Sequence, residues 1–65
     1  HELGLAKEYY QQALKTNPSF TTALFHLGLA LYYEGKRDSA HALWQRVLRL
    51  DPNYDKARQA LEQLR

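Results

Sequence analysis

TTALFHLGLALYYEG, residues 21–35, is the stretch of sequence that decides the fold. Between Ala23 and Tyr33 every residue is apolar or aromatic except His26 and Gly28. A surface helix has one apolar stripe and a polar back, whereas this segment is apolar on nearly all sides. It is also too short to span a bilayer, which needs about 20 apolar residues. The sequence therefore predicts a central helix with neighbouring helices on more than one side.

Three further segments flank this stretch and have the periodicity of amphipathic helices, with apolar side chains recurring at i, i+3, i+4 and i+7. Pro18 and Pro52 mark boundaries between them, because the residue before proline is disfavoured in the α region. Ser19 is predicted to cap the central helix, and Gly35 is predicted to end it. We expect an all-α fold of about four helices, near residues 2–16, 19–34, 37–50 and 53–64.

The composition limits the classes of protein to which the chain can belong. With 65 residues it is one domain at most, and a chain of this size buries only about 60% of its unfolded surface. It has no cysteine, so disulfides and thiolate metal sites are excluded. Lys and Arg total 9 against 7 acidic residues, and the net charge of +2 is too small and dispersed to indicate nucleic acid or a membrane as partner.

The ends of the chain bear on its origin. It begins at His1 and not at Met, so we expect an excerpt of a longer protein or a processed product. No signal peptide or transit peptide is visible, although its absence says little if the true N-terminus is missing. The compartment is not fixed by the cysteine usage, and the expectation is a soluble, cytoplasmic protein.

The chain resembles itself at a shift of 34 residues, the separation of Pro18 and Pro52. Residues of the same size and character coincide at this shift: Ala6 with Ala40, Tyr10 with Trp44, Leu14 with Leu48, Phe20 with Tyr54, Ala23 with Ala57 and Leu27 with Leu61. Self-similarity at a period of roughly 20 to 50 residues is typical of stacked repeats. The chain is therefore expected to stack equivalent helix pairs.

A period of this length with two helices resembles the tetratricopeptide repeat family. Residues 21–54 form one complete unit, in which Leu24, Leu27-Gly28 and Leu31 correspond to the W-x2-LG-x2-Y pattern of the first helix. The turn, small, aromatic, small and proline positions that follow are Gly35, Ala40, Trp44, Val47 and Pro52. The family often has Trp and Tyr where Leu24 and Leu31 stand, and both leucines keep the hydrophobic role. The resemblance implies antiparallel helix pairs of an α-solenoid, in which Gly28 and Ala40 permit close helix approach.

The resemblance also divides this single domain. Residues 1–20 are expected to be the second helix of one repeat, 21–54 a complete repeat, and 55–65 a first helix only. In that last helix Arg58 and Glu62 take the places of Leu24 and Gly28. Arginine does not fill a buried slot and glutamate does not permit close approach, so we expect this helix to be a polar-backed cap, which such arrays need for solubility.

No catalytic or metal-binding constellation stands out. Asp38, Ser39 and His41 contain the elements of a hydrolase triad, but neighbouring positions of a helix point in different directions and do not converge. His26 and His41 lie on different predicted helices without a third ligand at metal spacing. No glycine-rich phosphate loop occurs. We therefore expect no enzyme, no cofactor and no bound metal.

A second stripe of the central helix remains beside the residues that face its paired helix: Thr22, Phe25, His26, Leu29, Tyr32 and Tyr33. The resemblance implies that it lines a concave groove for an extended peptide or a partner helix, with Lys56, Gln59 and Gln63 on the same wall. Phe25 and Leu29 fit packing on neighbouring helices equally well. Tyr32, Tyr33 and Lys56 favour a groove role, since tyrosine suits a half-hydrated contact. Only Lys56 matches the family's carboxylate clamp, so we expect no clamp.

Two functions from different classes follow. The first is an adaptor module that binds a protein or peptide in an apolar, aromatic groove. The second is a structural module that forms homo-oligomers or adjoins further repeats, because arrays usually need about three units or more. The first helix would leave an apolar patch partly bare, and such a patch indicates adjoining repeats or a second copy. Its residues are Leu3, Leu5, Tyr9 and Tyr10.

Overall fold

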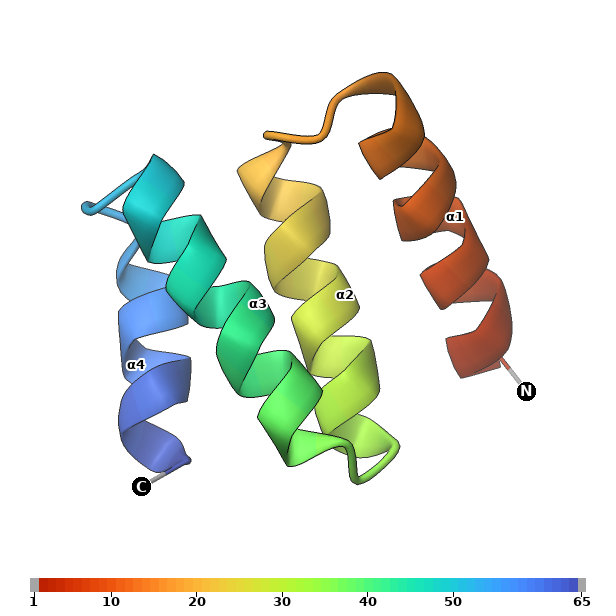
Figure 1. The fold of residues 1–65 in the computed structure, drawn as a ribbon. Coiled ribbons are helices and arrows are strands. Elements are labelled where there is room, and N and C mark those ends of the chain that lie inside the picture. The colour runs from red at the N-terminus through yellow and green to blue at the C-terminus, as the bar shows by residue number, and fades with distance from the viewer. Residues whose placement is uncertain (1, 65) are drawn as a thin grey trace.

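A computed structural model of the chain describes residues 2–64, with side chains from residue 4 onward. Within this part it contains four helices and no strand: α1 (Glu2–Thr16), α2 (Thr21–Tyr33), α3 (Arg37–Leu50) and α4 (Asp55–Gln63). Figure 1 shows them running alternately up and down, each packed mainly on the helix next to it in the sequence. The predicted all-α fold of antiparallel helix pairs is confirmed. α2 and α4 begin two residues later and end one residue earlier than predicted.

The core lies where α2 meets α3 and α4. α2 is buried on several sides, as expected of a central helix, through Ala23, Leu24, Phe25, Leu27, Gly28 and Ala30. α3 contributes Ala40, Trp44 and Val47, and α4 contributes Ala57. Trp44 is only 2% exposed, and its Nε1 donates a hydrogen bond of 3.1 Å to the carbonyl oxygen of Phe25. The indole is therefore packed in the core, and its one polar group, the Nε1–H, is hydrogen-bonded.

Gly28 lies directly against the indole of Trp44. A Cβ atom on Gly28 would come within 2.5 Å of Trp44 Nε1 and 2.9 Å of Cδ1, which is closer than real Cβ atoms approach other atoms. The predicted close approach at Gly28 is thus confirmed, and the group that requires it is the Trp44 ring. Ala40, the other small residue expected here, is fully buried.

The two proline-containing connections have the same local structure. Asn17 Oδ1 accepts a hydrogen bond of 3.2 Å from the Ser19 N–H, and Asp51 Oδ1 accepts one of 3.1 Å from the Asn53 N–H. The prediction that Ser19 caps α2 is wrong. The N-cap is Phe20, which makes no side-chain cap hydrogen bond. The reason is that the turn closed by Asn17 holds Ser19 outside the helix, a local bond that competes with capping.

Glu34, at the turn between α2 and α3, forms ion pairs with Lys7 of α1 and with Lys36 of the turn itself. Gly35, which follows it, has a φ of +86°, so the predicted left-handed glycine at the end of α2 is confirmed. The Glu34 carboxylate accepts hydrogen bonds of 3.0 and 3.1 Å from Lys7 Nζ, and Lys36 Nζ lies 3.5 Å away. The hydrogen bond from Lys7, opposed by partial desolvation and aided by both lysine charges, holds the pKa of Glu34 below its ordinary value of 4.5.

Acidification is expected to weaken the attachment of α1 through this carboxylate. Because the pKa of Glu34 is lower in the folded than in the unfolded chain, the stabilisation is complete above the unfolded pKa and is lost as pH falls through the folded pKa. The measurement is urea unfolding from about pH 6 to about pH 2, in which the difference in unfolding free energy between the native chain and Glu34→Gln should shrink towards zero. Glu8→Gln, an exposed carboxylate of α1, is the control. A difference that is constant with pH would contradict the ion pair.

Candidate functional site

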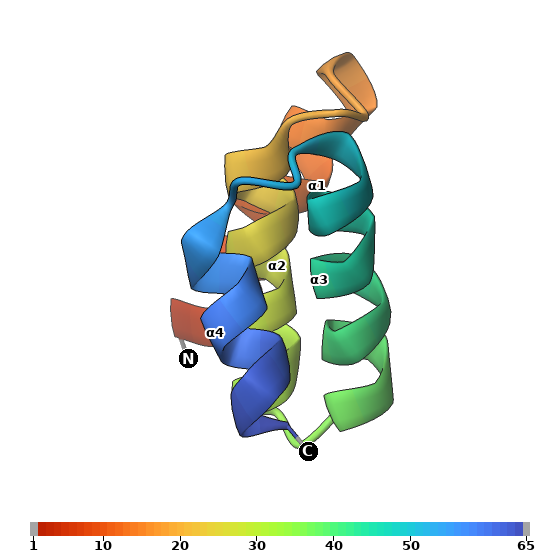
Figure 2. The ribbon, with the colours of Figure 1, turned by 90° about the vertical axis from the view of Figure 1, so that its left-hand side faces the viewer.

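A continuous row of side chains runs along one face of α2. Thr22, His26, Leu29 and Tyr33 are spaced by four, three and four residues, which places them on one helical face. The shift of one repeat carries Thr22 onto Lys56 of α4, and Figure 2 shows α2 and α4 on the same side of α3. We call this region the α2–α4 surface; its residues are Thr22, His26, Leu29, Tyr33, Lys56, Gln59 and Gln63.

Most of this surface is exposed to solvent. Tyr33 is 68% exposed, and Thr22 and the three α4 residues are also exposed. His26 is half-buried: its ring stacks on that of Tyr10 at 5.4 Å between centroids, and its Nδ1 lies 2.8 Å from the Thr22 carbonyl oxygen. In a neutral imidazole, a hydrogen bond donated by Nδ1 to that carbonyl leaves Nε2 as an acceptor. The surface therefore combines an exposed phenol and polar groups with the half-buried Leu29.

The remaining aromatic residues of the predicted groove, Phe25 and Tyr32, differ in how far they are buried. Phe25 is 7% exposed and lies in the core, its ring centroid 5.5 Å from that of Tyr54 and 6.1 Å from that of Trp44. Of the two alternatives for Phe25, packing on neighbouring helices is the one observed. Tyr32 is 38% exposed and its ring is 6.0 Å from that of Trp44, so it lies at the rim of the core. Leu29 also packs against the core cluster.

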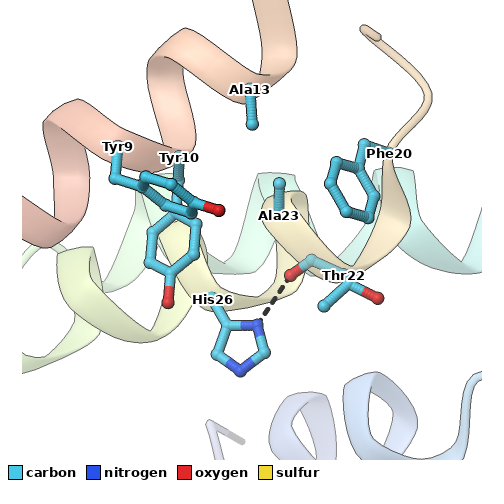
Figure 3. Close-up of a pocket in the computed structure, with 7 residues that line it drawn as sticks. All are labelled: Tyr9, Tyr10, Ala13, Phe20, Thr22, Ala23 and His26. Carbon is cyan, nitrogen blue, oxygen red and sulfur yellow. Dashed lines mark hydrogen bonds between the residues drawn. The ribbon is translucent and has the colours of Figure 1, made fainter.

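A second surface lies between α1 and α2. Tyr9 is 70% exposed, Leu5 69% and Phe20 43%. Next to them is a cleft of about 190 Å³, drawn in Figure 3, and we call its lining the α1–α2 face: Tyr9, Tyr10, Ala13, Phe20, Thr22, Ala23 and His26. Of the predicted contact residues, Tyr9 and Tyr10 line this cleft and Leu5 does not, whereas the side chain of Leu3 lies outside the described residues. Sequence reasoning missed Ala13 and Phe20, although the repeat aligns Phe20 with the packed Tyr54.

A further cleft of the described chain lies at the start of α3. Asp38 and His41, considered above as triad elements, line an open cleft of about 310 Å³ with Arg37 and Leu64. There Arg37 donates a hydrogen bond of 3.0 Å to the Leu64 carbonyl oxygen at the end of α4. Among residues 4–64, whose side chains the structure describes, no three metal-ligating side chains gather. Of the helices described, none has the length and apolar character needed to cross a membrane.

Comparison with known proteins finds two matches to one repeat family. The sequence model of the tetratricopeptide repeat matches residues 21–54, and a second model of this repeat matches residues 2–20. The chain is 31% identical over 67 residues to the photosystem I assembly protein Ycf3 of Acaryochloris marina (strain MBIC 11017), an alignment that covers 82% of this chain. It spans only 39% of the length of that relative. No solved structure matches the chain.

Proposed function

The chain belongs to the tetratricopeptide repeat family, whose repeats generally mediate contacts between proteins, and from that premise we propose that its α2–α4 surface binds a peptide or helix of a partner protein. The observation that carries the proposal is the row on α2, which is exposed at Thr22 and Tyr33, together with the exposed Lys56, Gln59 and Gln63 of α4, a helix that lies on the same side of α3 as α2 (Figure 2). Exposed tyrosine is enriched where proteins meet, because its ring supplies apolar area and its hydroxyl a hydrogen bond.

The chemistry of this surface favours a partner with both apolar and polar groups. Leu29 and Tyr33 supply apolar contact, and the amides of Gln59 and Gln63 can each donate and accept hydrogen bonds with a peptide backbone. Lys56 adds a positive charge that favours an acidic group on the partner. α2 is anchored in the core by Leu24 and its neighbours, so the row is held on a rigid helix. Little conformational entropy is therefore lost when a partner binds.

The relative named above gives a context for such binding. Its name describes the assembly of photosystem I, and an assembly function requires surfaces that hold other proteins. We infer a role of the same general kind here, in which the chain acts by binding another protein and not by catalysis.

Peptides selected on the chain from a displayed random library are expected to lose affinity when the α2–α4 surface is altered. Tyr33→Ser removes the exposed ring, and Lys56→Glu reverses the charge; each should weaken binding by about tenfold or more. Tyr9→Ser and Arg49→Glu make the same changes at exposed positions on α1 and α3, and should leave affinity unchanged. Titration calorimetry measures all four. Selected peptides that bind Tyr33→Ser and Lys56→Glu as tightly as the native chain would contradict the proposal.

A further inference from the structure

We propose that His26 determines which peptides the α2–α4 surface accepts, because its Nε2 atom accepts a hydrogen bond from a donor of the bound peptide. The donor is a backbone N–H, a side-chain amide or a hydroxyl group. A carboxylate or carbonyl oxygen of the peptide is disfavoured at the same place. This inference rests on the proposed function and deepens it, since it names a chemical group that the peptide must bring.

The ring of His26 is held in one orientation by three contacts. It stacks on the ring of Tyr10, with 5.4 Å between the centroids and 20° between the planes, and the ring of Phe25 lies 5.5 Å away at 79°. Nδ1 lies 2.8 Å from the carbonyl oxygen of Thr22, one turn earlier in α2. Rotation of the imidazole would break the stacking and the hydrogen bond together. The ring is therefore already oriented before a partner binds.

The contact with Thr22 also determines which nitrogen carries the proton of the neutral ring. A carbonyl oxygen only accepts hydrogen bonds, so the distance of 2.8 Å assigns this proton to Nδ1. The opposite tautomer would direct a lone pair of Nδ1 at the carbonyl oxygen, which is repulsive. In the neutral ring Nε2 therefore has a lone pair and no hydrogen, and it acts only as an acceptor.

Nε2 is accessible to solvent. In Figure 3 it points away from Ala13 and Ala23 and out of the cleft between α1 and α2. Within the described part of the chain Nε2 has no hydrogen-bond partner, yet no buried side-chain nitrogen or oxygen there lacks one, so water reaches Nε2. A peptide that covers the α2–α4 surface displaces this water. Unless the peptide supplies a donor, it leaves a buried acceptor unpaired, and that weakens binding.

The other polar side chains of the α2–α4 surface do not impose this choice. Its hydroxyl and amide groups each donate and accept, so they tolerate either kind of group on the peptide. Lys56 only donates, so it favours an acceptor. Among the side chains of this surface, neutral His26 is the one whose free polar atom only accepts. It therefore discriminates between peptides that its neighbours would treat alike.

Nuclear magnetic resonance of the ring nitrogens tests the proposal on the native chain. The probes are library peptides selected at about pH 8, at which an ordinary histidine is neutral, and kept if Tyr33→Ser or Lys56→Glu weakens their binding. In protein with labelled histidine nitrogens, such a peptide should move the Nε2 signal of His26 in the direction of an accepted hydrogen bond. The Nδ1 signal should change little. An Nε2 signal that stays in place, or that shows a bound proton, would overturn the proposal.

A double-mutant cycle tests the pairing of His26 with a peptide donor. His26→Phe keeps a ring against Tyr10 but removes both nitrogens, and it should weaken binding about tenfold. His41→Phe makes the same change at an exposed position of α3 and should leave the affinity unchanged. The donors of the peptide are then removed one at a time, by N-methylation of the backbone or replacement of the side chain. One removal should weaken binding to the native chain about tenfold and binding to His26→Phe hardly at all.

The outcomes separate this inference from the proposed function. Peptides that depend on Tyr33 or Lys56, but contain no donor coupled to His26, would overturn the inference and leave the proposed function in place. A selection in which no peptide is weakened by Tyr33→Ser or Lys56→Glu would overturn both. If His26→Phe disturbs the fold, the ring-nitrogen signals of the native chain still decide, because that measurement needs no variant in the complex.

Discussion

Replacing Trp44 with alanine is expected to lower the free energy of unfolding by about 3 to 5 kcal/mol, which is comparable to the whole stability of many small domains. The indole is 2% exposed and touches the rings of both Phe25 and Tyr32, so its removal opens a cavity between α2 and α3. It also removes the hydrogen bond from Nε1 to the Phe25 carbonyl oxygen. Urea unfolding followed by circular dichroism measures the loss.

Two further substitutions, Trp44→Phe and Tyr9→Ala, serve as comparisons for the stability loss of Trp44→Ala. Trp44→Phe keeps a ring in the same place but loses the Nε1 donor, so it should cost less than Trp44→Ala. Tyr9→Ala truncates an aromatic side chain that is 70% exposed, and it should change stability by no more than about 0.5 kcal/mol. A loss for Trp44→Ala as small as that for Tyr9→Ala would show that the indole does not hold α2 to α3.

Gly28→Ala is expected to destabilise the protein although alanine is the better helix former. On propensity alone the change should stabilise a helix interior by about 1 kcal/mol. The added Cβ, however, would lie 2.5 Å from Trp44 Nε1, so the ring or α3 must move. We expect the steric cost to prevail and the unfolding free energy to fall by about 1 to 3 kcal/mol. Thermal or urea unfolding provides the measurement.

Gly4 offers a matched control for this substitution. It also lies inside a helix, but a Cβ there meets no atom within 4 Å. Gly4→Ala should therefore leave stability unchanged or raise it. If Gly28→Ala also raised stability, the close contact with Trp44 would be refuted. In a Trp44→Phe background the penalty of Gly28→Ala should be smaller, because the two substitutions act on one contact.

Much of the fold could be predicted because its determinants are local or periodic. The prolines, Gly35 and the repeat of small and aromatic residues define the helices and their pairing, and Gly28 with Trp44 follows from that pairing. The capping of α2 could not be predicted, because Ser19 and Asn17 offer competing local hydrogen bonds. The bond made by Asn17 is the one observed.

The exposure of the candidate contact residues was harder to predict for a different reason. α2 is apolar on nearly all sides, so periodicity does not distinguish a covered from an open aromatic residue. Phe25 is buried and Tyr33 is exposed although both lie on the same apolar helix, because α3 packs on α2 and the ring of Tyr54 packs on that of Phe25. Phe20 was missed because its exposure depends on how the neighbouring helices pack and not on its own sequence context.

The packing of each helix mainly on its sequence neighbour has a consequence for how the chain reaches this structure. Contacts between segments close in sequence require only short loops to form, and all-helical domains with such contacts fold within microseconds to milliseconds. Ordering can then begin at the α2–α3 hairpin around Trp44 and spread outwards in both directions. In the described part of α1 no side chain is fully buried, whereas α4 buries Ala57, so α1 would be the last segment to settle and the first to fray.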